Sequence, residues 1–556
     1  MEQKRFRNSF SENIFRQKYA QGPSDTWDGL SERLVDDVCG PRNERDRPLL
    51  SASDRLDLAQ IIKEMKFIPG GRYLYYAGRP AKFYNNCYLL RAEDDTREEW
   101  SALTWRSMSC LMTGGGIGAD YSRLRAKGKA LKRTGGIASG PLSLMHTINE
   151  VGRNVMQGGS RRSAIYASLN HKHEDIYDFL SSKNWNSVPI KGTDLSVGGA
   201  KKADFNYPAP LDMTNISVNY DDDWLNKPNR HLDPVFFENV KQALSSGEPG
   251  FSFNFGDKQS ETLRNACTEV TSSDDSDVCN LGSINMGNID TLAEFTKVVS
   301  LASKFLVAGT LRAELPYDKV YSVREKNWRL GLGLMGIHEW LLKRGGRYEV
   351  NEELHKWLAV YRDESKRSAD EHCDRLFISR PVAYRAIAPT GSIGILACTS
   401  TGIEPLYAVA YKRRYLTEGT RWKYEYVIDG VAQRLISELG INPDSIESAT
   451  DLAKDYERRI KFQADLQDYV DMSISSTINL PEWGSSTNNE SKASKFAEVL
   501  SSYAPRLRGF TVYPDGARGG QPITKVDYKE AIANKGVVFE ELDICDISGK
   551  GGHCGS

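Results

Sequence analysis

Residues 265–269 read Asn-Ala-Cys-Thr-Glu, and a further cysteine, Cys279, follows twelve residues after the one in this motif. If the five residues are extended, the first, third and fifth side chains point to the same side, because side chains alternate along a strand. One pocket would then hold an amide, a thiol and a carboxylate, from Asn265, Cys267 and Glu269. Together with Cys279 and the distant Cys87, this set suits redox chemistry on a small hydroxylated substrate. The motif alone is weak, because buried cysteines are also common as inert core residues.

The composition is that of an ordinary soluble globular protein. The chain has 556 residues, of which 40% are hydrophobic and 26% charged, and its net charge is −1. This length predicts about three to four domain-sized units or one large barrel with additions. The balanced charge gives no sign of a nucleic-acid or membrane-surface protein. Residues 1–15 are unlike a signal peptide, and no apolar run is long enough to span a bilayer. Nine thinly spread cysteines indicate a reducing, cytoplasmic setting rather than a disulfide scaffold.

The hydrophobic pattern alternates between strand-like and helix-like segments, which favours an α/β architecture with one continuous core, such as a barrel. The clearest predicted helices cover residues 234–244, 292–306 and 352–376. We also expect helices over 327–343 and 451–472, and one or two strands within 73–90. The first fifty residues are charge-rich and weakly patterned, which predicts a flexible arm or a small cap. The glycine-rich residues 543–556 are predicted to form a mobile tail.

Three small-residue segments could bind phosphate. Residues 388–394 read Ala-Pro-Thr-Gly-Ser-Ile-Gly, whose backbone N–H groups and hydroxyls could cradle an anion. The segment lacks the lysine of a P-loop, and a structural turn is at least as probable. Residues 114–118 lack the rest of a dinucleotide-binding signature. Residues 158–162 offer two arginines, which suit phosphate recognition or simply a solvated loop.

The tail carries Cys545 and Cys554, which could form a disulfide exchanger on a swinging segment. With His553 they could instead hold part of a zinc site, but four good ligands are not visible locally. An unstructured tail is the third reading. His171 and His173 form an H-x-H pair without an evident third ligand, so we predict no metal site in this chain.

Taken together, these motifs resemble the catalytic subunit of a ribonucleotide reductase. The resemblance runs from about Ile61 to Val526 and continues into the tail, and each motif occurs in the family's order. The matching segments are Pro69–Arg72, Asn86–Cys87, Gly114–Gly116, Gly158–Ala164, Thr214–Val218, Asn265–Val270, Cys279–Leu281, Ala388–Gly394 and Thr399–Pro405.

The resemblance implies a ten-stranded α/β barrel with a central finger loop that carries a radical cysteine. It also implies a helical N-terminal region and a flexible C-terminal tail. We therefore expect an N-terminal arm and helical region at 1–68, the catalytic barrel at 69–527, and a short helix with a mobile redox tail at 528–556.

By the same resemblance, Cys267 would carry a transient thiyl radical that abstracts the ribose 3′ hydrogen. Glu269 would act as general base on the 3′ hydroxyl, and Asn265 would orient the sugar. Cys87 and Cys279 would form the reducing pair, which Cys545 and Cys554 would reset by disulfide exchange. The tail cysteines are more widely spaced than is usual in the family.

Substrate and effector sites also follow from the resemblance. The expected substrate-binding residues are Asn86, Thr390, Gly391, Ser392 and Ile393. Two basic glycine-rich loops match those that link an allosteric nucleotide, a deoxynucleotide or ATP, to substrate choice; their candidate residues are Lys127, Arg133, Gly159, Arg161 and Arg162.

The radical source divides the family. The glycyl-radical signature of the anaerobic type is not evident, nor is the Tyr-Tyr pair that receives a radical from a metal-containing subunit. Residues 392–405 and 509–516 look more like the adenosylcobalamin-dependent type, so we expect that cofactor. The alternative is a separate radical-generating subunit that acts through Tyr513. Expected partners are a ribonucleotide, an effector nucleotide, a thioredoxin-like or glutaredoxin-like reductant, and a second copy in a homodimer.

A different class of function is a nucleotide-binding regulatory paralogue without chemistry. The matched set of asparagine, glutamate and three thiols argues against it, because a protein that only binds has no need of them.

Overall fold

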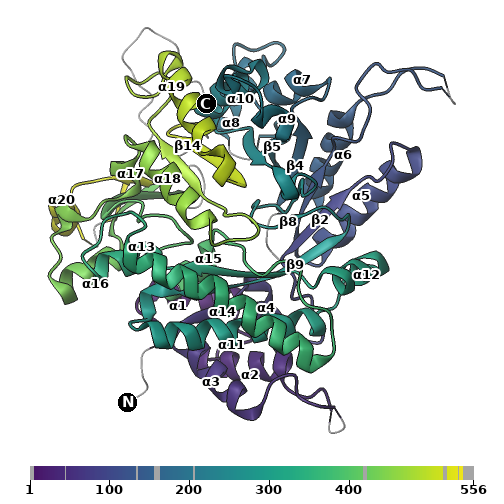
Figure 1. The fold of residues 1–556 in the computed structure, drawn as a ribbon. Coiled ribbons are helices and arrows are strands. Elements are labelled where there is room, and N and C mark those ends of the chain that lie inside the picture. Colours follow the sequence, from purple (N-terminus) through teal and green to yellow (C-terminus); the bar gives the residue numbers. More distant parts are fainter. Residues whose placement is uncertain are drawn as a thin grey trace, which may run out of the picture.

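The structure is a computed structural model that describes residues 5–43, 46–132, 135–155, 163–204, 207–416, 422–517, 523–535 and 538–541 (Figure 1). Its largest feature is a ten-stranded sheet flanked by helices. Within the described part of the chain, no helix is both long and apolar enough to cross a membrane.

Five parallel strands form one half of the barrel. In spatial order they are β2 (Cys87–Arg91), β3 (Gly116–Asp120), β4 (Ile165–Asn170), β5 (Thr214–Tyr220) and β6 (Gly250–Phe253). Almost every residue of these strands is buried, as expected for a parallel sheet covered on both faces. The helices between them include α5 (Arg97–Met112), α6 (Pro141–Asn154), α7 (Ile176–Ser181), α8 (Val197–Ala203), α9 (Asp222–Leu225) and α10 (Pro234–Ser246).

The second half contains two parallel pairs. One pair is β9 (Asp277–Asn285) with β10 (Leu330–Met335), and the other is β13 (Thr477–Leu480) with β14 (Gly509–Pro514). The halves meet antiparallel, β2 against β9 and β6 against β14. The tenth strand, β1 (Phe67–Pro69), also lies against β9.

An irregular segment, residues 383–388, spans the gap between β10 and the chain that leads into β13. It is linked by single bridges, Leu332 with Arg385 on one side and Ile387 with Ile474 on the other. Regular strand pairing therefore does not close the barrel, and this segment occupies the place of the missing strand.

Long helices cover the second half. Helix α14 (Glu352–Leu376) has the predicted bounds and packs on α11 (Leu292–Arg312), on the same side of β9 as the N-terminal helices (Figure 1). The remaining helices of this half are α12 (Asp318–Asn327), α13 (Ile337–Lys343), α15 (Gly391–Ala397), α16 (Gly430–Leu439), α17 (Ala449–Leu452), α18 (Tyr456–Gln467) and α19 (Glu490–Tyr503).

Three predicted elements were wrong in type or extent. Residues 327–343 are not one helix, because 330–335 form the buried strand β10. Its glycines allow close approach: a Cβ on Gly333 would lie 2.7 Å from the Ala386 carbonyl oxygen. The helix predicted over 451–472 is divided into α17 and α18, and part of the predicted strand region is the short helix α4 (Gly71–Tyr76).

The N-terminal region is a packed helical layer rather than a flexible arm. It contains α1 (Ser9–Lys18), α2 (Trp27–Cys39) and α3 (Ala52–Lys63). Helix α2 buries residues at the spacing of one helical face, namely Trp27, Leu30, Ser31, Leu34, Val35 and Val38. These side chains belong to the same hydrophobic core as the barrel. The structure agrees with the expectation of a small cap. The domain limits at residues 68 and 527 stay a prediction.

A separate four-stranded sheet, with strands in the order β15, β11, β12 and β16, and one short helix lie near the C-terminal end. Their bounds are β11 (Ala410–Leu416), β12 (Trp422–Ile428), β15 (Ile523–Lys525), α20 (Tyr528–Ala533) and β16 (Val538–Glu541). The predicted tail, with Cys545 and Cys554, lies outside the described residues.

Candidate active site

The Asn-Ala-Cys-Thr-Glu motif lies at the tip of a small hairpin, here called the finger hairpin (residues 263–272). Strands β7 (Leu263–Arg264) and β8 (Thr271–Ser272) pair antiparallel, and the six residues between them form the loop. The loop is not extended as predicted. It turns, because the Thr268 N–H donates to the Asn265 carbonyl at 3.0 Å and Thr268 has a φ of +71°.

The glycine cluster at 114–118 makes room for this hairpin. A Cβ on Gly118 would lie 1.9 Å from the Arg264 carbonyl oxygen, and one on Gly116 would lie 3.0 Å from the Ala266 Cβ. Both positions belong to β3, so the hairpin passes directly against the strand. The glycines are therefore explained by close packing.

Buried polar contacts hold the base of the hairpin. Glu261 accepts a hydrogen bond from the Thr271 hydroxyl at 2.7 Å and pairs with Arg508 at 3.0 Å. Next to Thr271 on β8, the Ser272 hydroxyl donates to Asp277 of β9 at 2.6 Å. Because these contacts tie both strands to the barrel wall, they limit movement of the loop that they carry.

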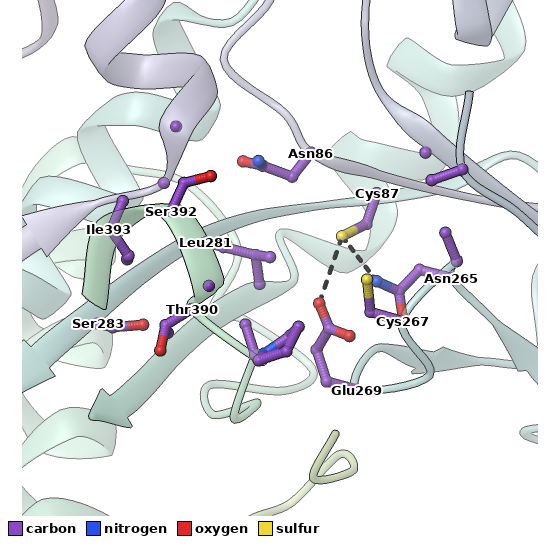
Figure 2. Close-up of a pocket in the computed structure, with 18 of the residues that line it drawn as sticks. Asn86, Cys87, Asn265, Cys267, Glu269, Leu281, Ser283, Thr390, Ser392 and Ile393 are labelled. Carbon is purple, nitrogen blue, oxygen red and sulfur yellow. Dashed lines mark hydrogen bonds between the residues drawn. The ribbon is translucent and has the colours of Figure 1, made fainter. Parts of the chain in front are cut away.

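The loop side chains reach one pocket, despite the turn. Asn265, Cys267 and Glu269 line it together with Cys87 at the start of β2. Figure 2 shows these groups on one side of the pocket, with Thr390 and Ser392 on the opposite side. The remaining walls come mainly from Gly70, Gly71, Asn86, Gly114, Ala164, residues 281–283 of β9 and residues 388–393.

Cys87 is the centre of a hydrogen-bonded group. The Asn265 side-chain amide donates to the Cys87 sulfur at 3.0 Å, and the Cys87 thiol donates to Glu269 Oε1 at 3.9 Å, a distance allowed for sulfur (Figure 2). The Val270 N–H donates to Asn265 Oδ1 at 3.0 Å, which fixes the orientation of the amide. Cys87 is thus positioned by two of the three motif residues.

Cys87 and Cys279 occupy directly opposite positions on β2 and β9. Opposed residues of an antiparallel pair have Cα atoms about 4.5–5.5 Å apart, within the range of about 4.4–6.8 Å that a disulfide needs. Both are thiols here, 2% and 1% exposed, in an apolar cluster with Leu89, Val270 and Met472. Burial raises the pKa of both thiols well above the ordinary value, so they stay protonated near neutral pH.

Glu269 has the properties of a base poised near neutral pH. Its side chain is almost fully buried, and burial raises its pKa to about 7. Oε1 accepts from Cys87, whereas Oε2 is buried without a hydrogen-bond partner among the described residues. A buried carboxylate oxygen without a donor can accept a hydrogen bond from a bound ligand.

The predicted phosphate turn forms the opposite end of the pocket. Thr390 has a φ of +49° and precedes α15, and its hydroxyl accepts from the Gly402 N–H at 2.8 Å. Residues 390–393 all line the pocket, and so does Asn86. The sequence-predicted substrate residues are therefore together, across the pocket from the sulfurs.

A family model described as "Ribonucleotide reductase, barrel domain" matches residues 85–201, 228–359 and 380–513. The chain belongs to the ribonucleotide reductase barrel family. The family resemblance and the α/β barrel class predicted from the sequence are confirmed.

Curated relatives of this family agree over most of the chain. A "Vitamin B12-dependent ribonucleoside-diphosphate reductase" of Mycobacterium tuberculosis is 26% identical over 86% of this chain and 75% of its own length. A protein of the same name from Thermoplasma acidophilum is 26% identical, over 84% of this chain and 66% of its own length.

Two solved reductase structures share the fold. A B-12 dependent (class II) ribonucleotide reductase matches with a TM-score of 0.70 and 16% identity, covering 94% of this chain and 93% of its own. The alpha subunit of the Actinobacillus ureae class Id ribonucleotide reductase matches with the same TM-score, 15% identity, and coverage of 92% and 97%. Because both types fit equally well, the fold does not distinguish between radical sources.

Sequence reasoning missed part of the reductase pocket. Tyr19 from the N-terminal helical layer and Ser283 from β9 line it, although neither belongs to a motif. Tyr19 reaches the pocket through tertiary packing, since a Cβ on Gly71 would lie 3.2 Å from the Tyr19 hydroxyl. Such a long-range contact leaves no local sequence signal.

The other predicted residues lie elsewhere. Lys127 does not line this pocket, and its backbone N–H donates to Asp175 at 2.9 Å. His171 and His173 have structural contacts, with Asp221 at 2.9 Å and the Leu124 carbonyl at 2.8 Å. The remaining effector-loop candidates, Arg133, Gly159, Arg161 and Arg162, fall outside the described residues.

Proposed function

We propose that this protein reduces ribonucleotides to 2′-deoxyribonucleotides with a cysteine radical and a dithiol. One observation carries the proposal most. In a member of the ribonucleotide reductase barrel family, two buried thiols stand opposite each other beside the finger hairpin, and Asn265, Cys267 and Glu269 share a pocket with one of them.

The assigned roles balance chemically. Cys267, as a thiyl radical, takes the hydrogen atom from ribose C3′, and Glu269 accepts the proton of the 3′ hydroxyl. The 2′ hydroxyl leaves as water, and Cys87 and Cys279 supply the two electrons and two hydrogens as they become a disulfide. Cys267 then returns its hydrogen to C3′, so one turnover consumes one dithiol.

The protonation states favour this assignment. Thiols with raised pKa values remain protonated and can donate a proton to the departing 2′ hydroxyl. A carboxyl with a pKa of about 7 can accept a proton and return it within the same turnover, because its two states are close in free energy near neutral pH. The apolar surroundings of the thiol pair also limit water near reactive sulfur.

The proposal assigns one orientation to the nucleotide in the pocket. Its phosphates would lie at residues 390–393, with Asn86 on the wall, and the ribose would lie between Cys87 and the finger loop. Thr390 and Ser392 face the sulfurs across the pocket, as this orientation requires (Figure 2).

Adenosylcobalamin is the proposed cofactor, in agreement with the names of the vitamin B12-dependent relatives. When bound, it supplies a carbon-centred radical that can take a hydrogen atom from a thiol. Cys267 is the residue that such a radical must reach, and its exposed side chain at the hairpin tip fits this requirement. The alternative is a partner subunit that delivers the radical through Tyr513 on β14, as the class Id likeness in fold permits.

Further partners follow from the same reaction. We assign the reset of the Cys87–Cys279 disulfide to Cys545 and Cys554, with a thioredoxin-like or glutaredoxin-like reductant in the cytoplasm. Effector nucleotides would act through the loops that contain Lys127, Arg133, Gly159, Arg161 and Arg162, in a homodimer.

The decisive experiment supplies the purified chain with CDP or CTP, dithiothreitol and adenosylcobalamin, and measures deoxycytidine nucleotide formation. Parallel reactions omit the cobalamin, or replace it with iron or manganese and candidate partner proteins. Product only with cobalamin supports the whole proposal, whereas product only with a partner supports the alternative radical source. Nucleotide binding without product under every condition would leave a regulatory protein.

A further inference from the structure

Helix α1 packs on α15, the helix that follows the phosphate turn, and the order of their contacts shows that the two run antiparallel. Three contacts follow one another along the pair. The Asn8 amide donates to the Cys398 sulfur at 3.3 Å, the Ser11 hydroxyl donates to the Ile395 carbonyl at 2.7 Å, and the Lys18 ammonium donates to the Ser392 hydroxyl at 3.1 Å. The last turn of α1 thus lies at the first turn of α15.

Burial fixes this arrangement. Ser11 and Phe15 are fully buried, and Phe15 packs edge-on against Trp27 at 6.2 Å between ring centroids. A buried serine that lost its partner would leave a polar group unsatisfied, which disfavours sliding of α1 along α15. The backbone position of Lys18 is therefore set by the core, although its own side chain is exposed.

The position of Lys18 matters because no described residue that lines the pocket carries a positive charge. Of the residues that line the described pocket, none is lysine or arginine, and the one carboxylate, Glu269, lies with the sulfurs at the far end. Ser392 lines the pocket and is bonded directly to Lys18, and Tyr19, the next residue in the chain, is itself part of the wall.

The pocket also gives one independent sign of a ligand. Glu269 Oε2 is buried without a donor among the described residues. A ligand that satisfied this oxygen through a hydroxyl and extended to Ser392 would bring its other end to the lysine. A sugar with a phosphate chain has this form, and a phosphate chain carries charge that one ammonium stabilises.

We infer that Lys18 is a substrate-binding residue that contacts the phosphate chain of the nucleotide at Ser392. This inference rests on the proposed function, and it deepens it by assigning a charge-recognition role to the N-terminal helical layer. Helix α1 lies outside the segments matched by the barrel family model, which begin at residue 85, so the proposed contact comes from outside the barrel.

The test is equilibrium binding of CDP, CTP and cytidine to the full chain without adenosylcobalamin, so that no turnover occurs. Lys18→Met should weaken binding of CDP and CTP by about tenfold to hundredfold, the loss expected for one charge-assisted hydrogen bond. Cytidine, which has no phosphate, should bind equally to both proteins. Lys18→Arg should retain most of the affinity, because the charge remains.

A matched control removes a lysine elsewhere. The Lys297 side chain on α11 is 56% exposed and pairs with the surface carboxylate of Asp57, so Lys297→Met should leave all three affinities unchanged. Salt gives a second readout, because the dependence of CDP binding on ionic strength should be smaller in Lys18→Met than in the wild type.

Two outcomes would overturn the role of Lys18. One is unchanged CDP affinity in Lys18→Met, and the other is an equal loss for CDP and cytidine, which would indicate a purely structural role. These results are separate from the fate of the proposed function. Wild-type protein that binds CDP through Lys18 but forms no deoxynucleotide would count against reduction, not against phosphate recognition.

Discussion

The barrel wall and the finger hairpin place thiols in opposite surroundings. Cys87 and Cys279 lie on β2 and β9 and are almost inaccessible to solvent, and burial raises the pKa of both. Cys267 lies at the hairpin tip with its side chain exposed. A pair that stores two electrons benefits from being close and protonated, whereas a sulfur that receives a radical must be reachable. In the proposed mechanism, the location of each cysteine, rather than its residue type, separates the radical-bearing role from the reducing role.

Removal of the exposed sulfur should have the largest effect on turnover. Cys267→Ser should lower deoxynucleotide formation by about 10³-fold or more, because the remaining groups act only after this sulfur. CDP affinity should stay within about twofold, since serine keeps the shape of the pocket wall. Activity above a tenth of the wild-type rate would contradict the assigned role.

Removing a buried sulfur should have a different signature. Cys279→Ser should reduce product formation by about 10²-fold or more, because a single thiol cannot supply two electrons. Loss of tritium from ribose C3′ should continue, since Cys267 and Glu269 are intact. Cys110→Ser, which alters an equally buried thiol on α5, is the matched control and should leave turnover unchanged. Complete loss of tritium release in Cys279→Ser would place both sulfurs in one step.

Glu269 accepts a hydrogen bond from the buried Cys87 and lies in the same loop as the exposed Cys267. Its replacement should have the next largest effect. Glu269→Gln should lower kcat by about 10²-fold, the usual contribution of a general base. In the wild type, kcat/KM should rise with pH through about 7, because the carboxyl must lose its proton to act as a base. A flat wild-type profile between pH 6 and 8 would remove Glu269 from this role.

The same carboxyl should affect stability. Below pH 4.5 both the folded and the unfolded chain hold the proton; as the pH rises towards 7 only the unfolded chain loses it, so stability falls. The shift from 4.5 to about 7 corresponds to about 3 kcal/mol at full effect. Glu269→Gln should therefore raise Tm relative to the wild type at pH 8, with little difference at pH 4.5.

The smallest expected effect comes from a substitution that tests how β3 holds the finger hairpin. Gly118→Ala should destabilise the fold by about 1–3 kcal/mol through overpacking and reduce activity by about tenfold, because the new Cβ would meet the Arg264 carbonyl. Gly22→Ala is the control, since no atom lies within 4 Å of its added Cβ. Equal behaviour of the two variants in thermal melts and in turnover would show that the hairpin can shift to accommodate the new Cβ.

Much of the site could be predicted because its residues lie in short motifs. Asn265, Cys267 and Glu269 converge as expected, although the reason given for it was wrong: a turn, not an extended strand, brings them together. Turn geometry depends on how β7 and β8 pair, and that pairing is set by tertiary contacts of Glu261 and Ser272 that no local pattern reveals.

The errors in the fold fall where the local hydrophobic pattern is not typical of the element that forms. Residues 330–335, Leu-Gly-Leu-Gly-Leu-Met, form a strand that is covered on both faces. They therefore contain no polar residues and lack the alternation of apolar and polar side chains by which half-buried strands are recognised. Helix α14 was predicted within its bounds because one face is exposed and its pattern is amphipathic. Helices α1 and α2, in the first fifty residues, were not predicted individually, because many charges mask their apolar faces.

The gap in the ring of strands has a mechanical consequence for substrate binding. Residues 383–388 close it through backbone hydrogen bonds to β10 and to residues 472–475, and they run directly into the turn at 390–393. A nucleotide would therefore contact this closing segment with its phosphates, while its ribose would rest on β2 and β9, one strand from each half. Binding would couple the segment that completes the cylinder to the junction between its two halves.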